Sequence, residues 1–279
     1  MKELTLKTPD QFPLAVKIFE PITSNGKLLL INSATGVKQQ IYFSFAKYMA
    51  ENGFTVLTYD YRGIGESKPK KMKGFVATMR IWGAIDFKTL TDFIQKDYPD
   101  YTKFCLGHSV GALILGMNED SRIFKKFVFV ATQDATLKNL KFKVAVTALF
   151  GFGLALPVMT QFFGYFPAHR FGLGESLPKG VAYDWQTLIL NNKSTSKLYE
   201  KIDSDFSKNL TQETFIIHAE DDTWVTDKGM NSLMKTVYPN LNKRFREVKI
   251  SESEKQEIGH INFFRTYNKI LWKVVFDEL

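Results

Sequence analysis

Short apolar runs alternate along this chain with longer segments of helical spacing. Two N-terminal segments alternate polar and apolar residues and predict a pair of antiparallel strands, Glu3 to Lys7 and Leu14 to Phe19. Six further apolar runs predict buried strands over Lys27 to Ile31, Phe54 to Tyr59, Phe104 to Leu106, Phe127 to Ala131, Thr214 to His218 and Phe245 to Ile250. Between them, helical spacing predicts helices over Lys38 to Glu51, Arg80 to Gln95, Gly111 to Met117 and Asn262 to Phe276. This alternation indicates an α/β fold, with a mostly parallel eight-stranded sheet flanked by helices.

One long stretch interrupts the alternation. About eighty residues separate the strand ending near Val130 from the strand beginning near Thr214, too many for a structureless loop in a compact domain. We interpret residues 137–210 as an inserted helical lid, and residues 1–136 and 211–279 as the core domain.

Within this insertion, Val144 to Ala168 carries no charged residue and is long enough to span a bilayer. Its glycines and prolines are expected to break it into short pieces: Gly151, Gly153, Pro157, Gly164 and Pro167. Both ends must return to one sheet, which favours an apolar lid packed over the active site. Peripheral contact of this lid with a membrane stays open.

Composition and charge narrow the setting. The 279 residues are 44% hydrophobic and 24% charged, as in a soluble globular protein, and the net charge of +8 comes from lysines spread along the chain. No aromatic-plus-basic pattern suggests a nucleic-acid partner. The single cysteine, Cys105, cannot form an internal disulfide and lies on a predicted buried strand. Met1 to Leu6 lacks the apolar core of a secretory signal, so we expect a cytoplasmic protein. The sequence does not indicate its oligomeric state.

The segment Gly107-His108-Ser109-Val110-Gly111 lies between a predicted strand and a predicted helix. A Gly-x-Ser-x-Gly motif in that position is typical of the nucleophile elbow of α/β-hydrolases. The turn is tight, so the flanking positions must lack bulk, and the serine hydroxyl is presented to a base on one side and a substrate carbonyl on the other. We therefore predict Ser109 as a nucleophile.

A serine hydroxyl needs a base and an orienting carboxylate, and in this fold the chain order is Ser, acid, His. Of the four histidines, His260 follows the last predicted strand and is the expected base; the others are His108 in the elbow, His169 in the lid and His218 in a strand. Three carboxylates follow the strand that contains His218, and Asp222 best fits the acid. Asp221 is the alternative and Asp134 a third candidate.

Acyl transfer also needs donors for the developing oxyanion. One is expected to be the backbone N–H of Val110, at the start of the helix after Ser109. The other should come from the loop after the Lys27 to Ile31 strand, where small residues allow close approach; Ala34 is the first candidate and Thr35 the second.

Together these motifs make the chain resemble an α/β-hydrolase over essentially its whole length. Asp60-Tyr61-Arg62-Gly63-Ile64-Gly65-Glu66-Ser67 resembles a segment with a mainly structural role in that superfamily. A bacterial group of α/β-hydrolases related to serine aminopeptidase-like hydrolases is similar over Asn32 to Val37, Met79 to Trp82, Gly107 to Gly111, Gly172 to Val181 and Ile258 to His260. The resemblance implies a Ser109, Asp222 and His260 triad. Many α/β-hydrolases carry a His-Gly pair where this chain has Asn32-Ser33, so the resemblance does not fix the oxyanion residue.

The expected function is hydrolysis of a small carboxylic ester with an apolar part, as in carboxylesterases and lipases (EC 3.1.1), because the lid is rich in aromatic residues. The triad chemistry requires no cofactor, and the chain shows no metal-ligand spacing. The same triad could serve an amidase, a peptidase or an acyltransferase. A hydrolase-like binding protein without catalysis is the alternative from another class.

Overall fold

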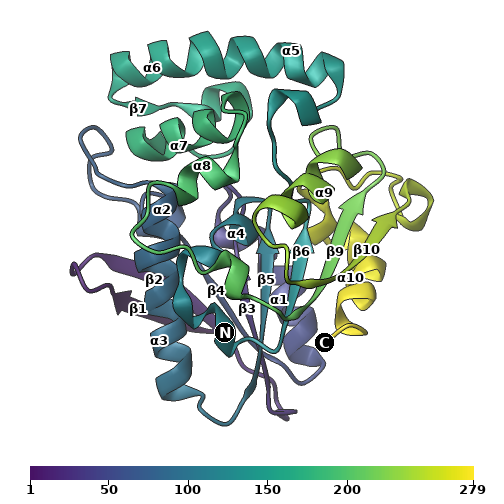
Figure 1. The fold of residues 1–279 in the computed structure, drawn as a ribbon. Coiled ribbons are helices and arrows are strands. Elements are labelled where there is room, and N and C mark those ends of the chain that lie inside the picture. Colours follow the sequence, from purple (N-terminus) through teal and green to yellow (C-terminus); the bar gives the residue numbers. More distant parts are fainter.

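An eight-stranded sheet forms the centre of the computed structural model, which describes residues 1–279 (Figure 1). Its strands are β1 Lys2–Lys7, β2 Pro13–Phe19, β3 Lys27–Asn32, β4 Thr55–Tyr59, β5 Thr102–His108, β6 Lys126–Val130, β9 Glu213–Ala219 and β10 Asn242–Val248. They lie in the order β1-β2-β4-β3-β5-β6-β9-β10. Strand β2 runs antiparallel to both neighbours, and all other neighbouring pairs are parallel. The predicted mostly parallel, eight-stranded sheet is therefore confirmed.

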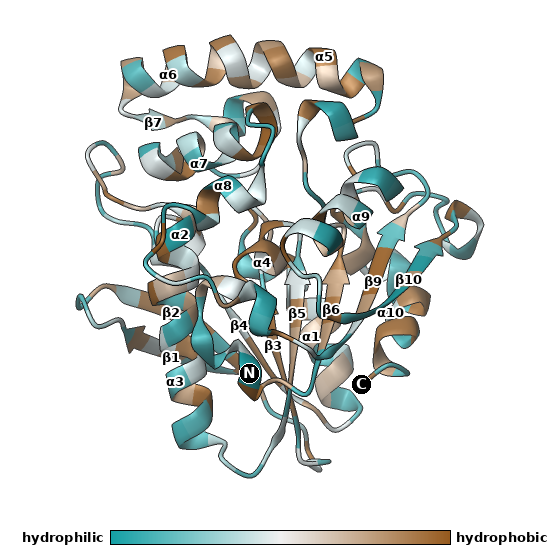
Figure 2. Ribbon diagram, viewed as in Figure 1, coloured by the Kyte–Doolittle hydropathy of each residue, from teal (hydrophilic) through white to brown (hydrophobic).

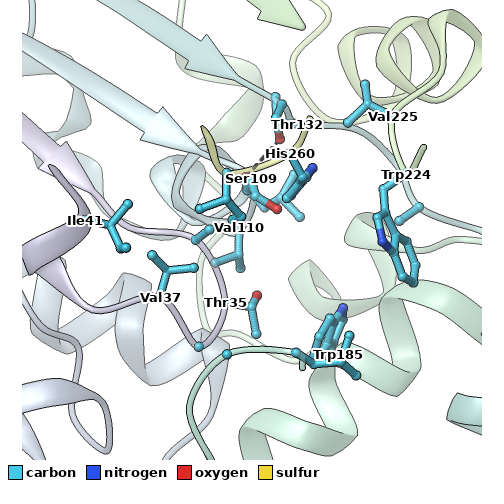
Figure 3. A pocket seen from close by; sticks show the side chains of 18 of the residues that line it. Thr35, Val37, Ile41, Ser109, Val110, Thr132, Trp185, Trp224, Val225 and His260 are labelled. Carbon is cyan, nitrogen blue, oxygen red and sulfur yellow. Dashed lines mark hydrogen bonds between the residues drawn. The ribbon is translucent and has the colours of Figure 1, made fainter. Parts of the chain in front are cut away.

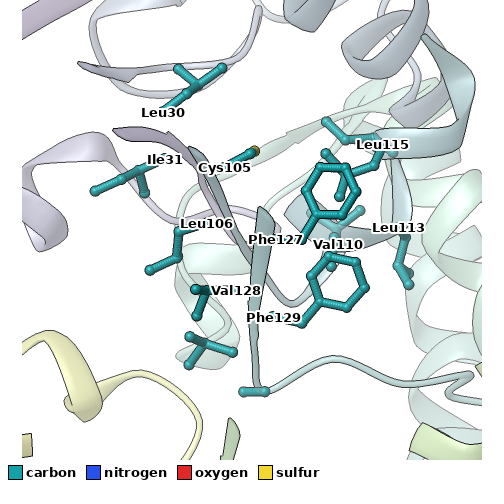
Figure 4. Close-up of a cluster of buried hydrophobic side chains, with 14 of the residues drawn as sticks. Leu30, Ile31, Cys105, Leu106, Val110, Leu113, Leu115, Phe127, Val128 and Phe129 are labelled. Carbon is teal, nitrogen blue, oxygen red and sulfur yellow. The ribbon is translucent and has the colours of Figure 1, made fainter. Parts of the chain in front are cut away.

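The central strands are buried on both faces because helices cover the sheet from both sides (Figure 1). Leu30 of β3, Cys105 of β5 and Phe127 of β6 have no exposed surface and pack into one apolar cluster (Figure 4). Burial raises the pKa of the Cys105 thiol well above its ordinary range, so this cysteine acts as a small apolar side chain, as expected.

Six helices belong to this core: α1 Phe43–Glu51, α2 Met79–Ile81, α3 Lys88–Asp97, α4 Val110–Leu113, α9 Asp227–Thr236 and α10 Lys269–Phe276. A π-helical turn, Trp82–Phe87, joins α2 to α3, which makes the predicted second helix continuous. The predicted closing helix is shorter than expected, because two 3-10 turns occupy residues 262–268 before α10 begins. Helix α9 was not predicted, and β10 begins three residues earlier than expected.

Between β6 and β9 the chain leaves the sheet and forms a helical insertion over the carboxyl ends of the strands (Figure 1). It contains α5 Phe142–Phe150, a π-helical turn Gly151–Ala155, α6 Leu156–Phe163, α7 Lys179–Leu190 and α8 Thr195–Tyr199. Two short strands, β7 Tyr165–Phe166 and β8 Leu177–Pro178, pair within it.

The apolar stretch of this insertion is not broken into short pieces as expected. One helix runs from Phe142 to Phe163 and ends only at Gly164, whose φ of 77° is left-handed. The π-helical turn ends at Ala155, two residues before Pro157. Proline has no backbone N–H to donate, and the wider turn before it accommodates this loss without breaking the helix. By length and composition alone this helix could cross a membrane. Only 17% of the residues in its most apolar 18-residue stretch are buried in the protein.

Candidate active site

The elbow has the backbone geometry that its sequence predicts. Ser109, between β5 and α4, has φ 52° and ψ −115°, a strained conformation for a residue with a side chain. A Cβ on Gly107 would lie 2.6 Å from the Cα of Ala112. A Cβ on Gly111 would overlap the carbonyl of Asn32 on the neighbouring strand. Both glycines are therefore required for the serine to stand at the end of β5.

His260 lies beside this serine (Figure 3) and forms a hydrogen-bonded pair with Asp222. The distance from His260 Nδ1 to Asp222 Oδ2 is 2.7 Å, and the Asp222 side chain is fully buried. Burial alone would raise the pKa of Asp222, but the charge of His260 and the backbone amides of Trp224 and Val225 outweigh it and lower that pKa. The ionised carboxylate accepts the proton of Nδ1, which leaves Nε2 of His260 free to act as a base.

The neighbouring carboxylate, Asp221, has a different position. Its two oxygens accept the backbone N–H groups of Ile258 at 2.9 Å and Gly259 at 2.8 Å. Asp221 therefore holds the loop that carries His260 but does not contact the imidazole, and of the two candidates only Asp222 is placed to orient the base.

The remaining candidates lie elsewhere. Asp134 accepts the hydroxyls of Ser232 and Thr236 and so binds α9 to the end of β6. His218 lies within β9, as expected, and His169 is exposed on the insertion. None of these three groups lines the cavity around Ser109.

A cavity of about 670 Å³ opens in front of Ser109 and His260 (Figure 3). The core contributes apolar side chains such as Val37 and Ile41 on one side. The insertion contributes Trp185 on the other, so the cavity lies between the two parts of the chain. Its volume and mostly apolar walls are those of a small-molecule site.

Comparison with known proteins gives one partial family match and several structures of similar fold. A family model described as "Serine aminopeptidase, S33" matches residues 25–153, which include the elbow. The structure is also similar to an esterase from Pyrococcus furiosus, with 14% identity, 99% of this chain and 90% of that chain covered, and a TM-score of 0.58. The similar structures show that this chain has the α/β-hydrolase fold, and the family model covers less than half of it.

Two further solved structures show the same fold. One is a thermophilic esterase from Thermogutta terrifontis, with 15% identity, 100% and 98% of the two chains covered and a TM-score of 0.59. The other is an α/β serine hydrolase from Xanthomonas campestris described as having no lid, with 14% identity, 98% and 91% coverage and a TM-score of 0.53. No curated protein sequence matches this chain.

The structure distinguishes the two candidate amides of the oxyanion loop. The backbone N–H of Ala34 donates a buried hydrogen bond to the hydroxyl of Tyr42 at 3.0 Å, so it is not free for a substrate oxygen. Thr35, the second candidate, lines the cavity, and its amide makes no hydrogen bond within the protein. Val110 begins α4, where a helix has no internal acceptor for its first amides.

The Tyr42 hydroxyl also joins the elbow to the histidine loop. It lies 2.8 Å from Nδ1 of His108, and Nε2 of His108 lies 2.8 Å from the carbonyl oxygen of His260. Because a carbonyl only accepts, His108 carries its proton on Nε2 and accepts the Tyr42 proton at Nδ1. Complete burial, reinforced by repulsion from His260, lowers the pKa of His108 to about 3, so this ring stays neutral.

The segment Asp60 to Ser67 has the contacts of a structural element, as its resemblance implies. Asp60 accepts the amides of Gln39 and Glu66, and Arg62 forms ion pairs with Asp10 and the buried Asp86. These bonds hold the loop after β4 against the neighbouring turns, and its side chains do not line the cavity.

Sequence reasoning missed how the insertion contacts the loop after β3. The amide of Glu175 donates to the carbonyl of Gly36 at 2.8 Å, and a Cβ on Gly174 would lie 2.5 Å from that same oxygen. Gly36 and Gly174 therefore allow the two backbones to touch beside Thr35. The glycines in Gly172 to Glu175 were the available signal, but nothing in the sequence pairs them with a segment so far away.

Proposed function

We propose that this protein, which has the α/β-hydrolase fold, is a serine hydrolase that cleaves a carboxylic ester with an apolar acyl or alcohol part. The observation that carries the proposal is the strained Ser109 at the end of β5, beside a histidine whose Nδ1 is held at 2.7 Å by the buried Asp222. A nucleophile, a base and an orienting carboxylate are the groups that serine-dependent acyl transfer requires.

In the proposed reaction His260 Nε2 takes the proton of Ser109 as Oγ bonds to the ester carbon. The amides of Val110 and Thr35 stabilise the negative carbonyl oxygen. The bond to the alcohol oxygen then breaks, and that oxygen takes the proton from His260. Water repeats the sequence on the acyl-enzyme: it gives a proton to His260, its oxygen bonds to the acyl carbon, and Ser109 recovers its proton as the acid leaves.

The charges in the cavity favour an ester over the free amino terminus of a peptide. An aminopeptidase needs an anion for the ammonium group of its substrate. Glu175 is the only carboxylate residue lining the cavity, and it is bound to Lys68 at 2.8 Å and to the amide of Gly65 at 2.6 Å. The other formally charged side chains there, Lys38 and Arg265, are cationic. An uncharged or anionic substrate suits these walls better than a cationic one.

We further propose that the insertion, residues 137–210, acts as a lid on a core formed by residues 1–136 and 211–279. It supplies Trp185, Leu188 and Ile189 to the cavity wall and contacts the loop that holds Thr35. The substrate would enter where these side chains meet the core.

Labelling with a fluorophosphonate tests the proposal, with Ser109→Ala as the control. A panel of p-nitrophenyl esters of increasing acyl length is then compared on the two proteins. We expect labelling and turnover that depend on Ser109, with a maximum at the chain length that fills the cavity. A folded protein that neither reacts nor turns over esters would instead indicate a binding protein. Hydrolysis of amides, or transfer to added alcohols in preference to water, would replace the ester assignment but keep the triad.

A further inference from the structure

The long helix of the insertion exposes an apolar face that nothing in the protein covers. Seven of its apolar side chains are 41–81% exposed: Phe142, Val146, Leu149, Phe150, Leu154, Val158 and Phe162. Most large exposed hydrophobic residues of the whole chain lie on this one helix. Figure 2 shows its two halves, α5 and α6, as the outermost layer beyond the carboxyl ends of the strands. A patch of this extent on a soluble protein marks an interaction surface.

The helix is built to keep this face continuous. Its buried residues recur every fourth position, at Ala148, Phe152, Leu156 and Thr160, and exposed apolar residues recur every fourth position from Val146 to Phe162. In a regular α-helix a step of four residues overshoots one turn by about 40°, so both stripes would wind around the axis. The π-helical turn at Gly151–Ala155 has more residues per turn and offsets part of that drift.

Cations lie at both ends of this apolar face, and no charge lies between them. Lys141 and Lys143 are exposed at the start of the helix. At its end, the Arg170 guanidinium lies 5.0 Å from the ring of Phe163, and the Lys179 ammonium lies 3.3 Å from Gln161. An apolar helix face bordered by cations matches an anionic bilayer, where the apolar side chains enter the acyl region and the cations meet the headgroups.

A second cavity, of about 460 Å³, lies against the inner side of the same helix. Gly151, Ala155 and other small or apolar residues of the helix form one wall. Leu173 and Trp224 line both this cavity and the one at Ser109, so these two side chains separate the cavities. An apolar chamber therefore lies between the exposed helix and the candidate nucleophile.

We propose that the helix Phe142–Phe163 docks on the surface of an anionic lipid bilayer, and that the second cavity admits a hydrocarbon chain of a membrane-borne ester on its way to Ser109. The docking rests on the exposed face and its flanking cations alone, whereas the path of the chain rests on the proposed hydrolase function. Both ends of the helix return to the same domain, so it lies on the membrane and does not cross it.

Vesicle flotation tests the docking. The full-length protein is mixed with vesicles of phosphatidylcholine and phosphatidylglycerol, or of phosphatidylcholine alone. We expect it to float with the anionic vesicles and less with the neutral ones. Phe150→Asp combined with Phe162→Asp should lower the floated fraction about tenfold. Ile22→Asp combined with Ile270→Asp, two exposed apolar residues of the core, is the matched control and should float like the wild type.

Two results would overturn the docking. One is a protein that stays with the soluble fraction in both vesicle types, or floats equally well with the two phenylalanines replaced. The other is a dimer in sedimentation without lipid that the same pair of phenylalanine substitutions dissociates, because the apolar face would then be covered by a second copy of the chain.

A cavity-filling substitution tests the path of the chain. A Cβ on Gly151 or on Gly153 meets no atom within 4 Å, but only Gly151 lines the second cavity. Gly151→Leu should slow turnover of a long-chain ester in vesicles at least about tenfold relative to p-nitrophenyl acetate, whereas Gly153→Leu should leave that ratio unchanged. Equal ratios in both variants would refute the path. Absence of Ser109 labelling by a fluorophosphonate would refute the hydrolase itself, and flotation would be unaffected.

Discussion

The two adjacent carboxylates, Asp221 and Asp222, differ in role and allow the site to be tested with one pair of substitutions. Each is replaced by asparagine, which keeps the shape and removes the charge. In the structure only the Asp222 carboxylate faces the imidazole, whereas the Asp221 carboxylate faces two backbone amides. The same chemical change should therefore lower the rate at one position and the stability at the other.

For Asp222→Asn the magnitude follows from the proton on the histidine. Trp224 and Val225 donate to Oδ1, which the asparagine carbonyl replaces without loss. The amide NH₂ then takes the place of Oδ2, 2.7 Å from Nδ1 of His260, where it can only donate. The imidazole must accept it at Nδ1 and carry its proton on Nε2, so it no longer acts as a base. We expect kcat/KM to fall about 10³–10⁴-fold, which is ~4–5.5 kcal/mol on the barrier.

For Asp221→Asn one of the two amides, of Ile258 or Gly259, loses its acceptor. A hydrogen bond to a charged group contributes about 1.5–3 kcal/mol, and the site is partly exposed, so water compensates for part of that. We expect unfolding free energy to fall by about 1–2 kcal/mol, and kcat/KM by less than about tenfold, because the imidazole keeps its partner.

Both variants are measured by turnover of a short p-nitrophenyl ester and by urea unfolding followed by circular dichroism. Equal loss of activity in the two folded variants would refute the assignment of separate roles. An Asp222→Asn variant that retains most of its activity would refute Asp222 as the orienting acid, whatever its effect on stability.

Three further predictions concern the elbow and its support. Gly111→Ala forces a methyl group into the carbonyl of Asn32 and should lower the free energy of unfolding by at least about 1–3 kcal/mol. Gly153→Ala places its methyl group where no atom lies within 4 Å and should raise the free energy of unfolding by roughly 0.5–1 kcal/mol. Urea unfolding measures both. Between about pH 3 and pH 6.5 His108 binds a proton in the unfolded chain but not in the folded protein, where it is buried. The free energy of unfolding should therefore fall with falling pH by up to about 1.4 kcal/mol per pH unit, and His108→Gln should reduce that slope. Tyr42→Phe leaves a buried amide and a ring nitrogen unpaired and should cost about 2–4 kcal/mol of unfolding free energy.

The sheet and the elbow could be predicted from the sequence because their signals are local. Strands covered on both faces are continuous apolar runs, and Lys27 to Ile31 differs from the structural β3 by one residue. The elbow needs glycine on both sides of Ser109 within five residues, so the constraint is visible in the chain itself.

The errors fall where the burial pattern is weak or the packing is distant. Strand β10 lies at the edge of the sheet and exposes almost every residue, including Arg244 and Arg246, so its start carries no apolar signal. The long helix of the insertion contains Gly151, Gly153 and Pro157, which usually end a helix. The π-helical turn that accommodates them depends on backbone geometry, which residue periodicity does not show.

The oxyanion loop shows why local signals are insufficient at the site. Small size made Ala34 a candidate, but the direction of its amide is decided by Tyr42, whose hydroxyl is oriented by His108. His108 precedes Ser109 in the elbow, does not line the cavity, and also binds the loop of His260. A single buried, neutral ring therefore ties the turn that carries Ser109 to the two loops that complete the site. Such a ring acts by positioning, so its loss should disturb the relative placement of all three parts, although it contacts no substrate.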